Sequence, residues 1–403
     1  MPHASDSQST DSQLSALQQA LQSGAFKPVR RMLRALHSAD IAHLLEASPP
    51  RHRAMLWTLL EPEREGNVLQ ELSDDVQAEF LRAMDTQALV GLLEGLETDD
   101  VADMLQQLPD KLTTEVLNAM DTQDRARVER ILPYDEESAG GLMNTDTITI
   151  RPDLSVDVVL RYLRRHAELP ATTDTLFVVN RSDKFLGLLS INKLLVCEPG
   201  MTVREVMITD FEGILPNTRD SEVAILFERN NWVSAPVINE DGVLLGRITI
   251  DDVVDVIRED ADHSLMSLAG LDEDEDTFAT IRKTTPRRAI WLGLNLMAVF
   301  LSANVINLFE ATIEKVVALA ILMPIVASMG GVAGSQTLTV IIRGMALGHV
   351  ARNNTKWLFT RELAVAGLNG ILWASVAGCV AALWFNDSTL GIIIASAMLI
   401  NLM

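Results

Sequence analysis

The stretch Val316–Ile342, with the sequence VVALAILMPIVASMGGVAGSQTLTVII, decides the architecture of the C-terminal part of the chain. Its 27 residues carry no charge, and a helix of that length crosses a hydrocarbon core of about 30 Å. Small residues allow helices to approach closely, whereas polar side chains are costly in lipid. The stretch contains a glycine–polar cluster made of Gly330, Gly331, Gly334, Ser335, Gln336 and Thr337. Two interpretations of this cluster stay open: it packs helices together, or it lines a path for a polar solute.

Three further apolar segments accompany this stretch, at residues 289–309, 363–385 and 388–403. Basic residues gather before the first segment and between the second and third: Arg287, Arg288, Arg343, Arg352, Lys356 and Arg361. Because cytoplasmic loops of membrane proteins carry an excess of Lys and Arg, this pattern places the soluble part of the chain in the cytoplasm. We predict an α-helical transmembrane domain over 286–403, in a multi-pass protein of the cell (inner) membrane that contacts membrane lipid.

Charge is divided unevenly along the 403 residues, whose net charge is −22. Residues 1–285 carry 51 acidic and 26 basic side chains, whereas residues 286–403 carry 4 acidic and 7 basic ones. Such an acidic soluble part repels phosphates, so we expect no nucleic-acid partner. The polar segment 1–26 lacks the apolar core of a signal peptide and is expected to be partly disordered. Cys197 and Cys379 fall in different compartments, so no disulfide is expected.

Residues 27–135 have the pattern of short amphipathic helices separated by turns at Pro or Asp. The segment 39–45 (ADIAHLL) resembles 99–105 (DDVADML), and the helical segments that follow each of them repeat at the same offset. Repeated helical hairpins stack into a superhelix that cannot bury its core one unit at a time. This part is predicted to be an α-helical, solenoid-like N-domain.

A second duplication, with a strand–helix–strand pattern, begins near residue 136. The segment 186–195 (LGLLSINKLL) matches 245–254 (LGRITIDDVV), and it resembles tandem cystathionine-β-synthase (CBS) domains. The resemblance implies two α/β domains, at 136–200 and 201–258. It also implies a nucleotide site, holding ATP through its ribose, at the Gly-x-x-Thr-x-x-Asp motif of the second domain: Gly246, Thr249 and Asp252.

Carboxylates form stripes at helical spacing in the N-domain and after the second CBS domain. Asp99 and Asp103 stand at i and i+4, and Asp252 starts a second stripe that leads into an acidic connector over 259–285. A solvated helix face is one interpretation. The other is that a divalent cation bridges two facing stripes, and Mg²⁺ is the natural candidate because the ligands are all oxygen atoms. Histidines are scattered without a metal-binding or catalytic motif, so we predict no enzyme.

The order of these parts resembles the MgtE-type magnesium transporters, which behave as ion channels. The resemblance also rests on the motif Gly-Gly-x-Ala-Gly-x-Gln-Thr at 330–337 and on 134–143 (YDEESAGGLM). It implies Mg²⁺ uptake by a homodimer with five spanning helices per subunit, a pore lined by the glycine–polar cluster, and a plug helix over 259–285. Cytoplasmic Mg²⁺ is expected to close the pore, in the service of Mg²⁺ homeostasis, by bridging sensor positions that here are Asp99, Asp103, Gly140, Asp252, Asp255, Glu259 and Asp260.

The fourth apolar segment stops at Met403. The fifth helix, which in the family carries the ion-selective carboxylate, is therefore expected to be missing, and the chain to be a fragment. Two alternatives stay open. The cargo is Co²⁺, Mn²⁺ or Ni²⁺ in one of them. In the other, the protein is a membrane-anchored CBS sensor of nucleotides or ions that transports nothing.

Overall fold

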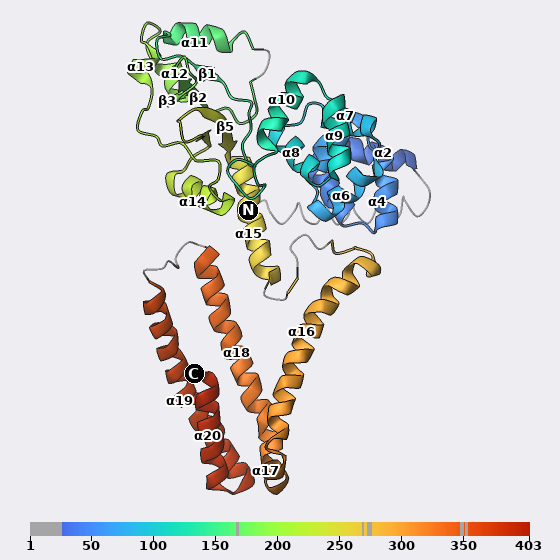
Figure 1. Cartoon of the computed structure of the whole chain (residues 1–403), viewed down its shortest axis with the longest axis vertical. Coiled ribbons are helices and arrows are strands. Elements are labelled where there is room, and N and C mark those ends of the chain that lie inside the picture. The colour runs from blue at the N-terminus through green and yellow to red at the C-terminus, as the bar shows by residue number, and fades with distance from the viewer. Residues whose placement is uncertain (1–25, 167–168, 268–269, 272–275, 347–349, 351–353) are drawn as a thin grey trace. The chain divides into compact units, whose positions relative to one another are not determined.

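The computed structural model describes residues 26–403 apart from 167–168, 268–269, 272–275, 347–349 and 351–353. The chain divides into two compact units, and Figure 1 labels most of their helices and strands. The first unit comprises residues up to Glu259 together with Asp274–Thr284, and the second comprises Asp260–Glu273 and Thr285–Met403. The N-terminal segment predicted to be partly disordered lies almost wholly outside the described residues.

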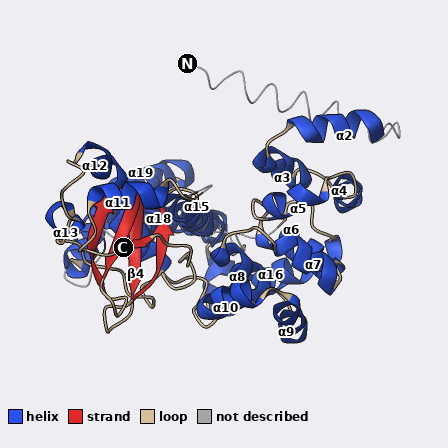
Figure 2. Cartoon of the chain, turned by 90° about the horizontal axis from the view of Figure 1, so that it is seen from above, coloured by secondary structure: helices blue, strands red, loops and turns tan. Residues whose placement is uncertain are grey.

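The N-terminal part of the first unit is a stack of short helices. They are α2 (Phe26–Ala35), α3 (Ser38–Glu46), α4 (Pro50–Trp57), α5 (Pro62–Leu69), α6 (Asp74–Ala83), α7 (Thr86–Leu93), α8 (Thr98–Gln106), α9 (Asp110–Ala119) and α10 (Thr122–Ile131). Alternate helices pack together, α3 on α5, α5 on α7, α7 on α9 and α8 on α10 (Figure 2). The helices α3 and α4 begin at Ser38 and Pro50, and α8 and α9 begin at Thr98 and Asp110, which is the same spacing. The predicted helical repeat is therefore confirmed.

Turn residues set the ends of these helices and apolar residues set their buried faces. Proline opens α4 at Pro50, where the missing N–H would have no partner anyway. Asp85 precedes α7 and accepts a hydrogen bond of 2.8 Å from the backbone N–H of Ala88. Leu45 and Leu105, which occupy equivalent positions in α3 and α8, are both fully buried. The helical repeat thus follows from local sequence and a shared core.

The α/β part of the first unit contains two copies of one motif. Its elements are β1 (Thr149–Ile150), α11 (Val156–Leu163), β2 (Thr175–Val179), β3 (Phe185–Ser190), α12 (Ile191–Val196), α13 (Val203–Val206), α14 (Asp220–Asn230), β4 (Ser234–Ile238), β5 (Leu244–Thr249) and α15 (Ile250–Ser267). The antiparallel pairs β2–β3 and β4–β5 share the same register, including a shift near their turns. β1 joins β2 in parallel, and the parallel bridge from Ile214 to Val237 takes the equivalent place in the second copy. The predicted tandem α/β domains are confirmed.

The connecting helix differs from the prediction of a helix over 259–285. α15 begins at Ile250, directly after β5, and ends at Ser267. Beyond it, Gly270 adopts a φ of +67° and its N–H bonds to the carbonyl of Ser267, an arrangement that ends helices. The next helix begins only at Ile281. Most of the acidic run at 272–276 lies outside the described residues, which include Asp276.

The second unit contains α16 (Ile281–Asn307), α17 (Glu310–Lys315), α18 (Ala318–Ala346), α19 (Thr355–Phe385) and α20 (Ser388–Leu402). Three of these helices, α16, α18 and α19, are long and apolar enough to cross a membrane, and α20 is a shorter apolar helix. α16 begins at Ile281 and α19 at Thr355, each about two turns ahead of the spans predicted to start at 289 and 363. Both helices include the charged residues that precede their apolar runs, so the length of an apolar run alone does not predict where the helix begins.

Candidate functional site

The start of α8 lies against the loop that precedes β1, within the first unit. The side chain of Asn144 donates a hydrogen bond to the carboxylate of Glu97, and the Thr145 hydroxyl donates to that of Thr98 at 3.1 Å. Asn144 and Thr98 are both buried. These hydrogen bonds hold α8 where its carboxylates meet those of α15.

Carboxylates from the two helices form what we call the acidic cluster: Glu97, Asp99, Asp100, Asp103, Asp251, Asp252 and Asp255. Asp99 is 5% exposed, and burial raises its pKa well above the usual range. The charge of Asp252 adds to this rise, followed by that of Asp100. Asp99 and Asp252, both predicted from the sequence, are thus brought together across two helices.

Two further members have a pKa near neutrality. Burial, together with the neighbouring charge of Glu97, raises the pKa of Asp100 to about 7, although Gln70 donates a hydrogen bond to it. Burial and the charge of Asp251 raise the pKa of Asp252 to about 7 as well. A carboxylate that resists ionisation at neutral pH lacks compensating positive charge. The cluster therefore favours a bound proton or a bound cation.

Asp103 extends the cluster toward the N-terminal helices. Burial raises its pKa well above the usual range, and the next largest cause is the charge of Glu136, ahead of Asp100 and Asp74. Among the described residues, the Oδ1 atoms of Asp99 and Asp103 are buried without a hydrogen-bond partner. Such orphaned anionic oxygens are expensive unless a donor or cation meets them.

The acidic cluster could hold a cation that keeps its own water ligands. Within the described part of the chain, no three His, Cys, Asp or Glu side chains meet closely enough to ligate a metal ion directly. Mg²⁺ keeps several of its waters and often binds carboxylates through them. A hydrated Mg²⁺ among these carboxylates would supply both donors for Asp99 and Asp103 and the missing positive charge.

The remaining predicted sensor positions differ in how closely they join the cluster. Asp255 belongs to it, because its charge helps to raise the pKa of Asp100. Glu259 is exposed one turn further along α15, and Asp260 belongs to the second unit. Gly140 is required by packing, since a Cβ there would lie 2.6 Å from Cδ1 of Tyr134. Ligand roles for these residues stay predictions.

The nucleotide motif has a structural role of its own. Where α15 begins, Asp252 Oδ2 accepts hydrogen bonds from the backbone N–H of Thr249 at 3.4 Å and from the Thr249 hydroxyl at 2.9 Å, so its carboxylate helps to fix the start of that helix. A Cβ at Gly246 would lie 2.7 Å from the carbonyl oxygen of Asn144, which explains the glycine. Asp252 therefore belongs both to the motif and to the acidic cluster.

The glycine–polar cluster on α18 divides into two faces. A Cβ at Gly330 would lie 2.8 Å from Cγ of Asn401 on α20, whose amide donates to the Val326 carbonyl at 2.7 Å. At Gly331 and Gly334, by contrast, an added Cβ would meet nothing within 4 Å among the described residues. Packing thus explains Gly330. The open face comprises Gly331, Gly334, Ser335 and Gln336, while Thr337 is half-buried on the Gly330 side.

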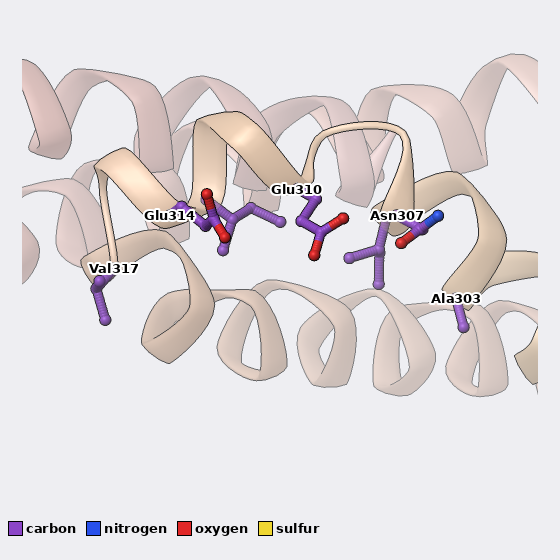
Figure 3. A pocket seen from close by; sticks show the side chains of 7 residues that line it. Ala303, Asn307, Glu310, Glu314 and Val317 are labelled. Carbon is purple, nitrogen blue, oxygen red and sulfur yellow. The ribbon is translucent and has the colours of Figure 1, made fainter.

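A separate, open pocket of about 360 Å³ is lined by residues of α16 and α17 and by Val317, which directly precedes α18. Figure 3 shows the side chains of Asn307, Glu310 and Glu314 along this turn. Val317 lies at the edge of this pocket, and the helix that follows it rises about 20 Å before it reaches Gly330. The pocket and the predicted pore residues are therefore different features of the second unit.

We expect the metal-free first unit to lose stability as the pH rises from about 4 to about 7. In the folded chain the pKa of Asp100 and Asp252 is about 7, against an ordinary value of 3.8. Between these values the folded state holds protons that the unfolded state has released, so raising the pH favours unfolding, and the effect ends above pH 7. Urea unfolding of the chain in metal-free buffer should show a lower midpoint at pH 8 than at pH 5.5. A midpoint that rises over this range contradicts the raised pKa values.

Comparison with known protein families matches three regions of the chain. The family model of the MgtE intracellular N domain matches residues 36–137. The CBS domain model matches 139–198 and 203–259, and the divalent cation transporter model of MgtE matches 323–403. These three models follow one another in the order that the sequence predicts.

Whole-chain relatives agree with these matches. The chain is 31% identical to the magnesium transporter MgtE of Thermus thermophilus, over 88% of this chain and 80% of that protein. It is 30% identical to MgtE of Bacillus subtilis, over 95% of this chain and 85% of that protein. Among solved structures, the cytosolic domain of the Mg²⁺ channel MgtE in complex with ATP is 34% identical, with a TM-score of 0.55, and covers 60% of this chain and 99% of that one. With matches over most of its length, the chain belongs to the MgtE family of magnesium transporters.

Proposed function

We propose that this chain is a subunit of a Mg²⁺ uptake channel of the cell (inner) membrane, closed by cytoplasmic Mg²⁺ bound at the acidic cluster. Relatives named as magnesium transporters support the cargo. The basic residues before α16 and between α18 and α19 support a cytoplasmic first unit. The observation that carries the gating proposal is the pair formed by Asp99 on α8 and Asp252 on α15. Asp99 is buried with an unpartnered oxygen, and Asp252 is half-buried and its charge raises the pKa of Asp99.

The gating follows from electrostatics. Without a cation, the carboxylates of α8 and α15 repel one another in a partly desolvated site, which favours their separation. A bound Mg²⁺ offsets that repulsion and favours the closed contact. The ion shifts the equilibrium only by the difference between its affinities for the two states. Glu259, Asp260 and Gly140 belong to this proposal as outer ligands.

The pore proposal rests on the open face of α18. Glycine and polar side chains at Gly331, Gly334, Ser335 and Gln336 are exposed within one chain, although α18 is apolar enough to span a membrane. A second copy of the chain that meets this face would enclose those polar groups, whereas lipid would leave them unsatisfied. We therefore propose a homodimer with its pore at this face and lipid around the remaining helices, and we assign no enzymatic step to the protein.

ATP is proposed as a second cytoplasmic ligand. The cytosolic domain of the related Mg²⁺ channel was solved in complex with ATP, and it is 34% identical to this chain. The motif residues Gly246, Thr249 and Asp252 lie together at the end of β5 and the start of α15. Because Asp252 also belongs to the acidic cluster, a nucleotide there would act on the same contact as Mg²⁺.

Uptake in cells that express the protein tests this function. With low internal Mg²⁺, an intracellular Mg²⁺ indicator should report uptake, and raising internal Mg²⁺ should suppress it. Competition by Co²⁺, Mn²⁺ or Ni²⁺ tests the alternative cargoes, and comparison with Thr249→Ala at fixed ATP tests the nucleotide. Absence of uptake, with Mg²⁺ or ATP binding retained, would instead support a membrane-anchored sensor.

A further inference from the structure

A buried ion pair joins the N-terminal helices to the segment that precedes the first membrane helix. Arg53 on α4 is only 1% exposed, and its guanidinium lies 3.0 and 3.1 Å from the two carboxylate oxygens of Asp276. The side chain of Asp276 is 8% exposed. It lies shortly before α16 begins at Ile281, and both Arg53 and Asp276 belong to the first unit.

Both partners are fixed by additional hydrogen bonds. Arg53 Nε donates to the Leu45 carbonyl at 3.1 Å, and its Nη1 also reaches Glu79 at 3.4 Å. Asp276 Oδ1 accepts a hydrogen bond of 2.9 Å from the backbone N–H of Phe278, so the same carboxylate shapes the turn ahead of α16. A planar guanidinium that meets a carboxylate with two parallel bonds is specific as well as strong.

A second ion pair nearby is weaker. Lys283, in the first turn of α16, lies 2.9 Å from Asp75 on α6, but its side chain is 43% exposed. Exposed ion pairs contribute little because water screens them. Of these two ion pairs, the buried one between Arg53 and Asp276 therefore attaches this segment to the helices more firmly.

We propose that Arg53 and Asp276 form a tether that holds the N-terminal helices to the chain ahead of α16 whether or not Mg²⁺ is bound. The two charges neutralise each other, so no cation is needed. The tether lies on α4 and the connector, and it includes no residue of the acidic cluster on α8 and α15. Arg53 and Asp276 are positioning residues, because they act on the membrane helices only through the chain between them.

The tether determines how the proposed gate would move, and this consequence rests on the proposed function. Loss of Mg²⁺ would open the contact between α8 and α15, while α4 stays attached ahead of α16. The N-terminal helices would then pivot about α4 instead of separating from the rest of the chain. The short chain from Asp276 to Ile281 reaches about 18 Å at most, so the pivot would act directly on the first membrane helix.

Hydrogen exchange of the whole chain, with and without Mg²⁺, tests the tether. Asp276→Asn is the main variant, because asparagine keeps the turn at Phe278 and removes the charge. It leaves the buried Arg53 with only the longer contact to the exposed Glu79, so the amides of α4 and of residues 277–280 should exchange about tenfold faster or more at both Mg²⁺ levels. Lys283→Gln, which breaks the exposed pair, should change the same amides by about twofold or less.

Wild type and a second variant complete the test. In the wild type, removal of Mg²⁺ should speed exchange in α8 and leave α4 and 277–280 protected. Arg53→Lys keeps the charge but loses the paired bonds, so it should give intermediate protection, which a misfolded chain would not. Equal loss of protection at 277–280 and in α8 when Mg²⁺ is removed, or unchanged exchange in Asp276→Asn, overturns the tether. If Mg²⁺ leaves α8 unaffected while Asp276→Asn still speeds exchange at 277–280, the gating proposal fails and the tether stands.

Discussion

Replacing Asp99 and Asp252 together by asparagine should make the contact between α8 and α15 nearly independent of Mg²⁺. These two carboxylates lie in one buried site, where the charge of Asp252 makes Asp99 harder to ionise. Asparagine has nearly the same shape but no charge, so it removes both the repulsion in metal-free buffer and a reason for Mg²⁺ to bind. Limited proteolysis of the whole chain, with and without Mg²⁺, measures the contact.

The expected effect is large because both charges are desolvated. We expect Mg²⁺ to slow cleavage of the wild type by about tenfold, which corresponds to about 1.4 kcal/mol, and that of the double variant by about twofold or less. A matched control is Asp110→Asn with Glu240→Gln, two exposed carboxylates outside the cluster. The control should respond to Mg²⁺ as the wild type does. If the Asn variant keeps the full Mg²⁺ response, Asp99 and Asp252 are not part of the sensor.

Gly330→Ala should destabilise the packing of α18 on α20 by about 1–2 kcal/mol. The new methyl group would occupy the place of the Asn401 amide, which donates a hydrogen bond to the Val326 carbonyl. Either the amide moves and loses that bond, or the helices move apart. Heating the detergent-solubilised chain and measuring the fraction that stays monodisperse should show a lower midpoint than in the wild type.

Two companion variants separate packing from other effects. Gly331→Ala enters open space within one chain and should leave the midpoint nearly unchanged, so any loss of uptake would point to the second copy or the pore. Asn401→Ala removes the obstructing amide. Adding Gly330→Ala to that variant should therefore lower the thermal midpoint much less than Gly330→Ala does alone, because the two residues are in contact. Additive losses would show that Asn401 is not what Gly330 accommodates.

Duplication made much of the fold predictable from the sequence. The likeness between 39–45 and 99–105 coincides with α3 and α8, because a helical repeat preserves its caps and its buried positions. The β-hairpins repeat in the same way, including their register shifts. The end of α15 at Ser267 was not predictable from the acidic composition of 259–285, because that composition carries no helix-ending signal.

The site was predictable only in part. Helical spacing identified Asp99 and Asp103, but it passed over Glu97, Asp100, Asp74 and Glu136, which enter through tertiary packing around α8. The adjacent acidic pairs 99–100 and 251–252 were the available signal. The tether joins residues that lie far apart in the sequence, on α4 and just ahead of α16, so no local sequence pattern predicts it.

Spacing separates the faces of α18 only in part. Gly331 and Ser335 stand at i and i+4 on one side of the helix, but Gly330, Gly334 and Thr337 stand at i, i+4 and i+7, so spacing alone groups Gly334 with Gly330. An asparagine in the last apolar segment, Asn401, was a further signal, because a polar side chain in a membrane helix usually bonds to a neighbouring helix. Only the structure shows that this partner is the Val326 carbonyl, one turn before Gly330.

Direct measurement of bound Mg²⁺ tests the central claim, that the acidic cluster binds Mg²⁺. Equilibrium dialysis of the whole chain against Mg²⁺ should be compared between the wild type, Asp99→Asn with Asp252→Asn, and Glu310→Gln with Glu314→Gln. The last variant removes two carboxylates of the second unit that lie outside the cluster. We expect Asp99→Asn with Asp252→Asn to bind less Mg²⁺ per chain than the wild type, and Glu310→Gln with Glu314→Gln to bind the wild-type amount. Equal binding by the wild type and Asp99→Asn with Asp252→Asn would contradict it.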